Sequence, residues 1–336
     1  MRVLVTGGGG FLGRAVCARL VAAGHQVRSL SRSRHPELAA LGVRQRSVDL
    51  RDRQAVADAI TGCEAVVHCA AKAGAWGPDA EFRAVNVRGT EHVIRGCLDN
   101  GVRRLVFTSS PSVVHAGRDL EGVDESVPYA RRFPAAYPRT KAVAERLVLA
   151  ADSPRLATVV LRPHLIWGPG DPHFLPRVLA AARAGRLRLV GGEGKRVDTI
   201  YLDNAAEAHV LALDRLEPAA PICGRAYFLS QGDPRSPGEL LNALLAAAGL
   251  PPETRRIPPL AARAAAAVLE TAYRAARVRA EPPLTRLVAA QLGTSHWFDI
   301  SAARRDLGYR PRVSTEEGLR RLAAYLAAGP APAEGR

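Results

Sequence analysis

Residues 2–13 read RVLVTGGGGFLG, and this stretch decides the fold. The apolar run RVLVT predicts a buried strand, and the apolar spacing that follows the glycines predicts a helix over residues 10–23. Gly7, Gly10 and Gly13 stand between these two elements at G-x-x-G-x-x-G spacing. A strand, a glycine-rich turn and a helix in this order are typical of a dinucleotide-binding fold.

Each glycine of this turn has its own steric task. Gly7 permits the tight turn, Gly10 lets the backbone approach a pyrophosphate, and Gly13 lets the helix pack closely on the sheet. The N-terminus of the helix then offers free N–H groups and the positive end of its dipole to the phosphates. The residues that we predict to form this part of a cofactor site are Gly7, Gly10, Phe11, Leu12 and Gly13.

Short apolar runs and helical patterns alternate through the first 165 residues. Further strands are predicted over residues 26–30, 43–48, 65–68, 104–108 and 157–161. The helices between them are predicted over residues 52–60, 82–100 and 136–151. This order predicts an α/β fold of the Rossmann type, with a doubly wound parallel sheet.

The pattern changes after residue 165, where proline and glycine become frequent and helices then dominate. Short strands are expected near residues 197–200 and 226–229. We expect a nucleotide-binding domain over residues 1–165, to which residues 197–215 return, and a smaller, mostly helical substrate-binding lobe over residues 166–330. The helices expected in this region cover residues 174–184, 204–216, 237–248, 260–277 and 315–328.

The end of the second predicted strand distinguishes the two nicotinamide dinucleotides. An acidic residue there would accept hydrogen bonds from the ribose of NAD, but residues 29–35 read SLSRSRH and contain no acid. Arg32 is placed to pair with the 2′-phosphate of NADP, because a guanidinium offers phosphate a rigid fork of donors. An incidental arginine in an arginine-rich chain is the alternative. The missing acid favours NADP, used as NADPH, over NAD.

Two more strand ends supply candidate cofactor contacts. Asp49 and Leu50 follow the third strand, where Asp49 can accept from the adenine amino group and Leu50 can pack on the ring. A helix cap is an alternative role for Asp49. Ala70 and Ala71 follow the fourth strand and are small enough for the cofactor to lie against the backbone.

The catalytic signal is AYPRTK, in which Tyr137 and Lys141 are four residues apart. On a helix these positions share one face. A neighbouring ammonium favours the phenolate and lowers the tyrosine pKa from about 10, so that Tyr137 can serve as a general acid or base. The strand end FTSSPS supports this interpretation, because Ser110 can donate a hydrogen bond to the reacting carbonyl. Ser109 is its possible substitute, and a surface helix pair with an ordinary serine turn is the alternative for the whole set.

The composition of the chain excludes several classes of function. The 336 residues carry 47 basic and 32 acidic side chains, a net charge of +15, and such a field attracts anions. The arginines are scattered and form no tract, so we do not expect nucleic-acid binding. Five cysteines without a CxxC pair argue against a metal site and for a reducing compartment, the cytoplasm. Neither a signal peptide nor a transmembrane segment is expected.

The combined motifs TGxxGxxG, SS, YxxxK and LRPxxxWGPGD resemble the extended short-chain dehydrogenase/reductase superfamily over nearly the whole chain. The resemblance is greatest to its 3β-hydroxysteroid dehydrogenase-like branch. The segments that carry it are HCAAKAGAWG, TSSPSVVH, LIWGPGD, KRVDTIYLDNAAEAH and EPPLTR. The resemblance implies that Asn86 supports the catalytic lysine through a water. It also implies that Arg162 and Pro163 belong to a segment that runs alongside the nicotinamide.

The resemblance also implies a reaction, namely the NADPH-dependent reduction of the 3-oxo group of 2-alkyl-3-oxoalkanoates in olefin biosynthesis. Tyr137 would protonate the carbonyl oxygen, Ser110 would stabilise the developing oxyanion, and Lys141 would tune Tyr137 and bind the ribose. A homodimer through the helices of residues 82–100 and 136–151 is the family expectation. Val114 and His115 replace the Tyr-Gly usual in sugar-nucleotide epimerases, which counts against a sugar substrate.

Several alternatives stay open from the sequence. The chain can be a hydroxysteroid dehydrogenase-like enzyme, a sugar-nucleotide epimerase or dehydratase, or a non-catalytic regulator that senses NADP. The lobe helices of residues 260–278 and 284–292 can line an apolar groove for two alkyl chains. They can equally contact a membrane surface or a partner enzyme, or simply pack together with solvated arginines.

Overall fold

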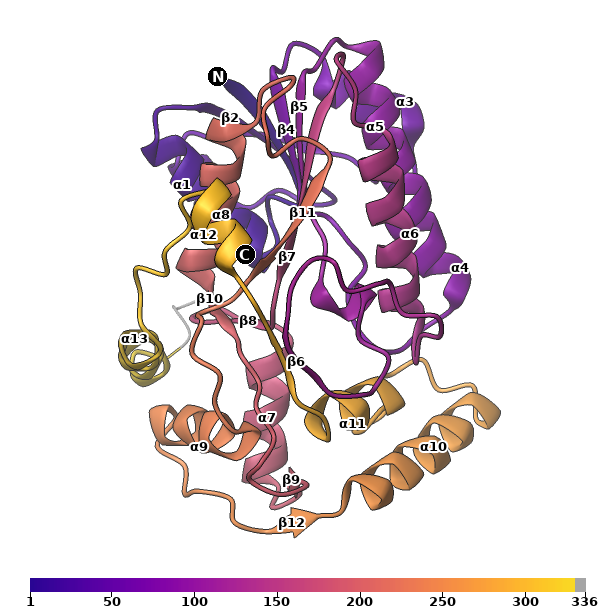
Figure 1. Ribbon diagram of the computed structural model, residues 1–336, viewed down its shortest axis with the longest axis vertical. Helices are drawn as coiled ribbons and strands as arrows, with labels where there is room; N and C mark the ends of the chain where they lie inside the picture. Colours follow the sequence, from indigo (N-terminus) through magenta and orange to yellow (C-terminus); the bar gives the residue numbers. More distant parts are fainter. Residues whose placement is uncertain (330–336) are drawn as a thin grey trace.

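The computed structural model describes residues 1–329, and a seven-stranded parallel sheet forms its centre (Figure 1). The predicted α/β fold with a doubly wound parallel sheet is confirmed. The strands in sheet order are β11 (Arg225–Leu229), β7 (Ala157–Pro163), β5 (Arg104–Thr108), β4 (Ala65–His68), β1 (Arg2–Thr6), β2 (Gln26–Ser31) and β3 (Arg44–Ser47).

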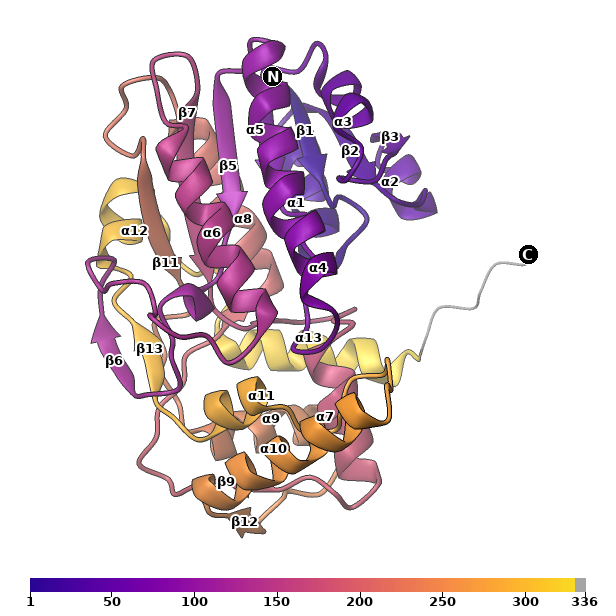
Figure 2. The same cartoon turned by 90° about the vertical axis from the view of Figure 1, so that its right-hand side faces the viewer.

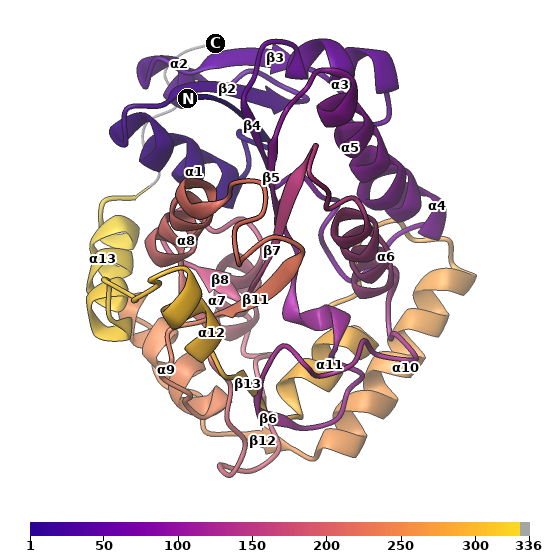
Figure 3. The same cartoon turned by 45° about the horizontal axis from the view of Figure 1, so that its top comes forward.

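Helices cover both faces of this sheet, as Figure 3 shows. One face carries α1 (Phe11–Ala22), α2 (Pro36–Ala40), α8 (Leu202–Arg215) and α12 (Ser301–Asp306). The other face carries α3 (Arg53–Ile60), α4 (Asp79–Phe82), α5 (Gly89–Asp99) and α6 (Ala136–Ala150).

Strand β1 illustrates why the sheet is buried on both sides. Val3 and Val5 pack in the core beneath α1 and α8, whereas Leu4 packs in the core beneath α3 and α5. All three side chains are fully buried. Successive side chains of a strand point to opposite faces, so a strand covered on both faces is apolar at every position.

The remaining elements gather at the carboxyl end of the sheet and form a lobe there (Figure 2). Three short parallel strand pairs belong to this region: β6 (Leu120–Val123) with β13 (His296–Phe298), β8 (Ile166–Trp167) with β10 (Ile200–Tyr201), and β9 (Leu189–Val190) with β12 (Arg256–Ile257). The helices are α7 (Phe174–Arg183), α9 (Pro237–Ala247), α10 (Pro259–Ala275), α11 (Arg286–Leu292) and α13 (Thr315–Ala327). Among residues 1–329, no helix is both long and apolar enough to cross a membrane.

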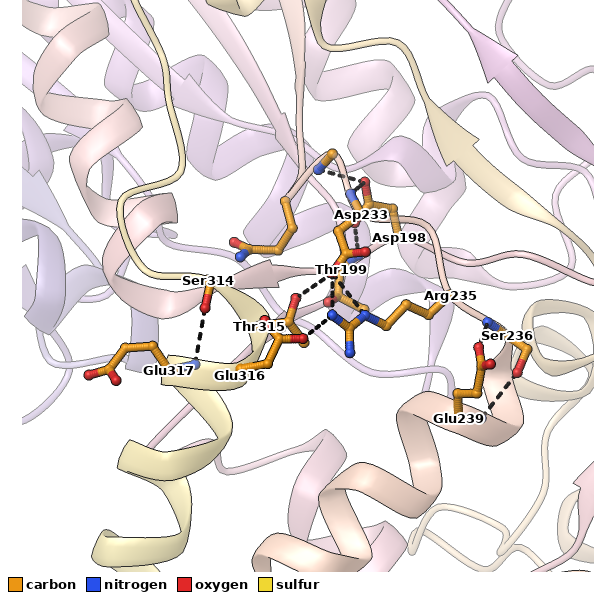
Figure 4. A network of polar contacts seen from close by, with 12 residues as sticks. Asp198, Thr199, Asp233, Arg235, Ser236, Glu239, Ser314, Thr315, Glu316 and Glu317 are labelled. Carbon is orange, nitrogen blue, oxygen red and sulfur yellow. Dashed lines mark hydrogen bonds and ion pairs between the residues drawn. The ribbon is translucent and has the colours of Figure 1, made fainter.

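A polar network connects the starts of α9 and α13 (Figure 4). Arg235 pairs with both Asp233 and Glu316, and Thr315 donates to Asp233 over 3.0 Å. Ser236 caps α9 by accepting from the backbone N–H of Glu239, whose side chain accepts in return from the N–H of Ser236. Such reciprocal capping satisfies helix donors that otherwise lack partners. The network therefore fixes how these two helices begin.

Three stretches differ in detail from the sequence expectation. The helix expected over residues 82–100 is continuous but contains a π-helical turn, η1 (Arg83–Arg88), before α5. Of the strand expected near residues 197–200, only Ile200 lies in a strand, β10. Residues 226–229, which were assigned to the lobe, lie in β11 at the edge of the main sheet because this strand pairs in parallel with β7.

Candidate active site

The glycine turn has the shape of a phosphate cradle. Gly7 has a φ of +69°, and a Cβ atom there would lie 2.8 Å from the Cα of Ala70. A Cβ on Gly13 would lie 2.0 Å from the carbonyl oxygen of Gly7. Helix α1 has Gly10 as its N-cap and no side chain that caps its first N–H groups. The turn therefore fits a dinucleotide, because the first N–H groups of α1 have no side-chain cap and can donate to a phosphate.

The residues that follow β2 and β3 lie near each other at the predicted adenosine side. Arg32 is exposed, and among residues 1–329 no acidic side chain lies within ion-pair distance of it. Asp49 is bound by the guanidinium of Arg51, with 2.6 Å between Nη2 and Oδ2. Hydrogen bonds from Arg51 hold the pKa of the Asp49 carboxyl below its usual value. Leu50 is buried against Gly89 of α5. Asp49 is thus already engaged, whereas no partner of the Arg32 guanidinium lies among residues 1–329.

The end of β4 lies directly opposite the glycine turn. Thr6 and His68 share a hydrogen bond of 2.6 Å through Oγ1 and Nδ1, and the N–H of Ala70 donates to the same Thr6 hydroxyl over 3.2 Å. Burial of the His68 ring lowers its pKa to about 3, so the ring is neutral. Ala70 is half-buried against Gly7, and Ala71 is exposed. Small side chains therefore border the cradle on this side.

Tyr137 and Ser110 meet at the carboxyl end of the sheet. Tyr137 is half-buried in the first turn of α6, and Ser110 follows β5. Burial raises the pKa of the Tyr137 phenol, and a hydrogen bond with Ser110 partly offsets this effect. The Ser112 hydroxyl donates to the Ser110 hydroxyl over 2.9 Å. Ser109, in contrast, donates to a buried carboxylate, that of Glu145. Of the two serines considered, Ser110 is the one beside the tyrosine.

Lys141 lies one turn along α6 and is almost completely buried. Its ammonium donates to the carbonyl oxygen of Thr108 over 2.6 Å and lies 3.9 Å from the centre of the Phe107 ring. Burial lowers the Lys141 pKa to about 7, although Glu145 acts in the opposite direction. The expected lowering of the Tyr137 pKa by Lys141 is not found, because desolvation of the phenol is the largest effect and raises that pKa.

Asn86 occupies the π-helical turn η1 and is buried. Its side-chain oxygen accepts from the N–H of Lys72 over 2.7 Å, and its amide group donates to the carbonyl oxygen of Lys72 and to the hydroxyl of Thr140. Asn86 thus connects the segment after β4 with α6, beside Lys141. A direct hydrogen bond between Asn86 and Lys141 is not among those of the described residues.

Residues 4–259 match the model of the 3-beta hydroxysteroid dehydrogenase/isomerase family. The chain belongs to this family. The resemblance stated from the motifs is therefore confirmed, and the protein is an oxidoreductase that uses a nicotinamide dinucleotide.

Two bacterial relatives named 2-alkyl-3-oxoalkanoate reductase are each 52% identical to the chain. The protein of Stenotrophomonas maltophilia aligns over 98% of this chain and 100% of its own length. The protein of Shewanella oneidensis aligns over 96% of this chain and 85% of its own length. A solved structure of Thermus thermophilus UDP-glucose 4-epimerase in complex with NAD is 27% identical, covers 98% of this chain and 100% of that chain, and superposes with a TM-score of 0.74.

In this member of the family, sequence reasoning missed the buried partners that surround Lys141 and Tyr137. Glu145 is fully buried and forms an ion pair of 2.5 Å with Arg162 of β7. It also accepts hydrogen bonds from Ser109 and Tyr129. Spacing could have revealed Glu145, because it extends the face of Tyr137 and Lys141 by one further turn of α6. The sequence did not predict the ion pair, because Arg162 and Glu145 are 17 residues apart and lie on different elements.

Proposed function

We propose that this dehydrogenase is a 2-alkyl-3-oxoalkanoate reductase, which converts the 3-oxo group of long-chain β-keto acids to a hydroxyl group. The observation that carries this proposal is 52% identity, over nearly the whole chain, to two enzymes of that name. The side chains that the reaction needs, Ser110, Tyr137 and Lys141, lie together at the carboxyl end of the sheet. Ligands of open α/β sheets bind at this end.

The proposed chemistry assigns one task to each side chain. The nicotinamide supplies a hydride to the carbonyl carbon when it is bound. Tyr137 gives its proton to the carbonyl oxygen, and Ser110 stabilises the negative charge that develops there. Lys141 holds the ribose and orients Tyr137, and Asn86 positions the turn of α6 that carries Lys141. Pro163, at the end of β7, borders the nicotinamide.

The same experiment tests the substrate class and the alternatives. A 2-alkyl-3-hydroxyalkanoic acid with NADP, and its 3-oxo acid with NADPH, should both be turned over, as followed by NADPH absorbance. A 3β-hydroxysteroid and a UDP-sugar are the comparison substrates, and we expect at least about 100-fold lower kcat/KM for each, which corresponds to about 2.7 kcal/mol of lost transition-state stabilisation. Preference for a steroid or a UDP-sugar would exclude the reductase proposal. Binding of NADP without turnover of any alcohol or ketone would indicate a regulator.

We also propose NADP as the cofactor, with Arg32 as the residue that selects it. Arg32 follows β2, is exposed and has an unpaired guanidinium among the described residues, and it lies close enough to influence the Asp49 carboxylate. Such a group suits a 2′-phosphate. The other cofactor contacts proposed are Gly7, Gly10, Phe11, Leu12, Gly13, Asp49, Leu50, Ala70 and Ala71.

Exchange of Arg32 for aspartate should reverse the cofactor preference. The KM for NADPH should rise at least about tenfold, because one charge-assisted phosphate contact of roughly 1.5–3 kcal/mol is lost and a repulsive charge is added. The KM for NADH should fall, because the carboxylate can accept from the ribose hydroxyls. Steady-state kinetics with both cofactors measure the change. Arg34→Asp is the comparison, and because Arg34 can at most assist Arg32, it should change the preference less. An unchanged NADPH/NADH preference would show that Arg32 does not contact the phosphate.

We also propose a domain division, a homodimer interface and an outer contact surface. The domain division is proposed as stated from the sequence, residues 1–165 and 166–330, with residues 197–215 and β11 adjoining the sheet. A homodimer is proposed through α5 and α6, which lie side by side and leave Val143 of α6 exposed (Figure 2). Helix α10 packs on α11 through Ala262 and Ala266 and exposes Leu260 and Val268, and contact of its outer face with a membrane surface or pathway enzyme stays a prediction.

A further inference from the structure

Three buried histidines form a cluster that the proposed chemistry does not use. His164 follows β7 directly, His115 follows the serine segment, and His296 begins β13. The Nε2 atom of His164 lies 2.9 Å from Nδ1 of His296, and the ring of His115 lies 5.1 Å from that of His296. Each of the three side chains is at least nine-tenths buried. All three are held mainly neutral, because burial lowers their pKa values.

The hydrogen-bond pattern fixes which nitrogen carries a proton. The Nε2 atom of His296 lies 2.8 Å from the carbonyl oxygen of Gln291, which can only accept, so this nitrogen is protonated. The Nδ1 atom of the neutral His296 ring is then an acceptor, and His164 must donate to it from Nε2. The remaining Nδ1 atom of His164 is buried and has no hydrogen-bond partner in residues 1–329. A buried polar atom without a partner indicates a missing ligand or water.

The position of His164 connects this atom with the reaction. His164 comes one residue after the end of β7, at the same edge of the sheet as Ser110 and Tyr137. Arg162, two residues earlier, reaches Glu145 of α6, and side chains two residues apart in an extended strand share a face. His164 therefore lies on the α6 side of β7, where Tyr137 also lies.

A second unpartnered atom lies on the same stretch of β7. The Nη1 atom of Arg162 is buried and has no hydrogen-bond partner among the described residues, because Glu145 occupies only the other side of the guanidinium. The Arg162 guanidinium lies over the ring of Phe228, which stacks on Phe298, and Phe298 contacts the ring of His164. The end of β7 thus has unused hydrogen-bonding capacity in a mostly apolar surrounding.

We propose that His164 binds the substrate carboxylate, with Nδ1 protonated and donating to a carboxylate oxygen while Nε2 keeps its hydrogen bond to His296. This inference rests on the proposed function, because it requires a substrate with a carboxylate near the reacting group. In a 2-alkyl-3-oxoalkanoate a single carbon atom separates the carboxylate from the reacting carbonyl. The carboxylate must then lie close to Ser110 and Tyr137. Lys141 is engaged by Thr108 and Arg162 by Glu145, whereas Nδ1 of His164 has no hydrogen-bond partner among residues 1–329.

Binding of the carboxylate is therefore coupled to the uptake of one proton. Without ligand the His164 ring is neutral at pH 7, and a bound carboxylate stabilises the protonated form. The charged or titratable groups around it are His296 of β13 and His115, with Asp119 and Arg263 acting on the cluster from further away. Asp119 is itself paired with Lys195. A rise in pH removes the proton, so binding of the acid weakens as pH increases.

The test compares a 2-alkyl-3-hydroxyalkanoic acid with its methyl ester, both oxidised with NADP. Effects of pH on Tyr137 and on the cofactor are common to both substrates and cancel in the ratio of their kcat/KM values. For the native enzyme we expect this acid-to-ester ratio to fall about tenfold per pH unit between pH 7 and 9, as one coupled proton requires. His164→Phe should lower the ratio at pH 7 at least about tenfold and remove its pH dependence. Its kcat/KM for the ester should fall by a clearly smaller factor than its kcat/KM for the acid.

The exposed His173 provides the matched control, because His173→Phe makes the same exchange nine residues further along and should leave the ratio and its slope unchanged. An acid-to-ester ratio of the native enzyme that does not change with pH overturns the proposal, and this result needs no variant. Equal losses for acid and ester in His164→Phe overturn it as well, because they indicate a structural role. Failure of the native enzyme to oxidise either substrate would instead contradict the proposed function.

Discussion

Replacement of Tyr137 by phenylalanine should lower kcat by about 100- to 10,000-fold, the range that a positioned proton donor contributes. The variant keeps the ring, which is half-buried at the start of α6, and loses only the hydroxyl group. Because burial raises the pKa of this phenol, the native side chain is protonated at neutral pH and can give its proton to a carbonyl oxygen. The decay of NADPH absorbance with the 3-oxo acid measures the effect.

Cofactor binding and stability separate this result from a folding defect. The Kd of Tyr137→Phe for NADPH, measured by fluorescence titration, should stay within about fivefold of the native value, and the thermal midpoint should change little. Lys141→Met is the comparison, because it should weaken cofactor binding and turnover together. A Tyr137→Phe enzyme that keeps more than one tenth of native kcat would show that another group protonates the substrate.

The sequence predicted the sheet well because its central strands are buried on both faces. Continuous apolar runs such as RVLVT and ATVVL are required where helices cover both sides, and the glycine turn marked the order of the first elements. The pattern predicts a strand over residues 226–229 in the lobe, but 61 residues separate the end of β7 from the start of β11, its neighbour in the sheet. That pairing is tertiary, and local pattern carries no information about it. The π-helical turn η1 could not be predicted from the sequence either, since it keeps the helical spacing of its neighbours.

Local spacing was sufficient to propose those residues of the candidate site that lie on one element or at one strand end. Tyr137 and Lys141 share α6, and Ser110 ends up beside Tyr137 because β5 ends at the same edge of the sheet. The electrostatics of Tyr137 were not predictable, because the depth of its burial depends on the surrounding elements. The cluster of three histidines could not be predicted either, because His115, His164 and His296 come from three distant segments that only the tertiary fold brings together.

The buried ion pair between Arg162 and Glu145 predicts the largest effect on stability. Arg162→Met should lower the free energy of unfolding by about 3–5 kcal/mol, because it leaves a buried carboxylate without its cation. Glu145 has no exposed side-chain surface and Arg162 only 4%, so water cannot replace the lost partner. Denaturant titration followed by circular dichroism measures the change, and exposed Arg139→Met, which breaks an ion pair with Asp79, should cost no more than about 1 kcal/mol.

The double variant Glu145→Gln with Arg162→Met decides whether the charge itself causes this loss. Glutamine can still accept hydrogen bonds from Ser109 and Tyr129, but it is neutral and needs no cation. We therefore expect the double variant to recover at least half of the stability that Arg162→Met loses, since a well-packed neutral pair avoids most of the desolvation cost. A double variant as unstable as the single one would mean that Arg162 acts through its packing against Phe228 and Tyr129 and not through its charge.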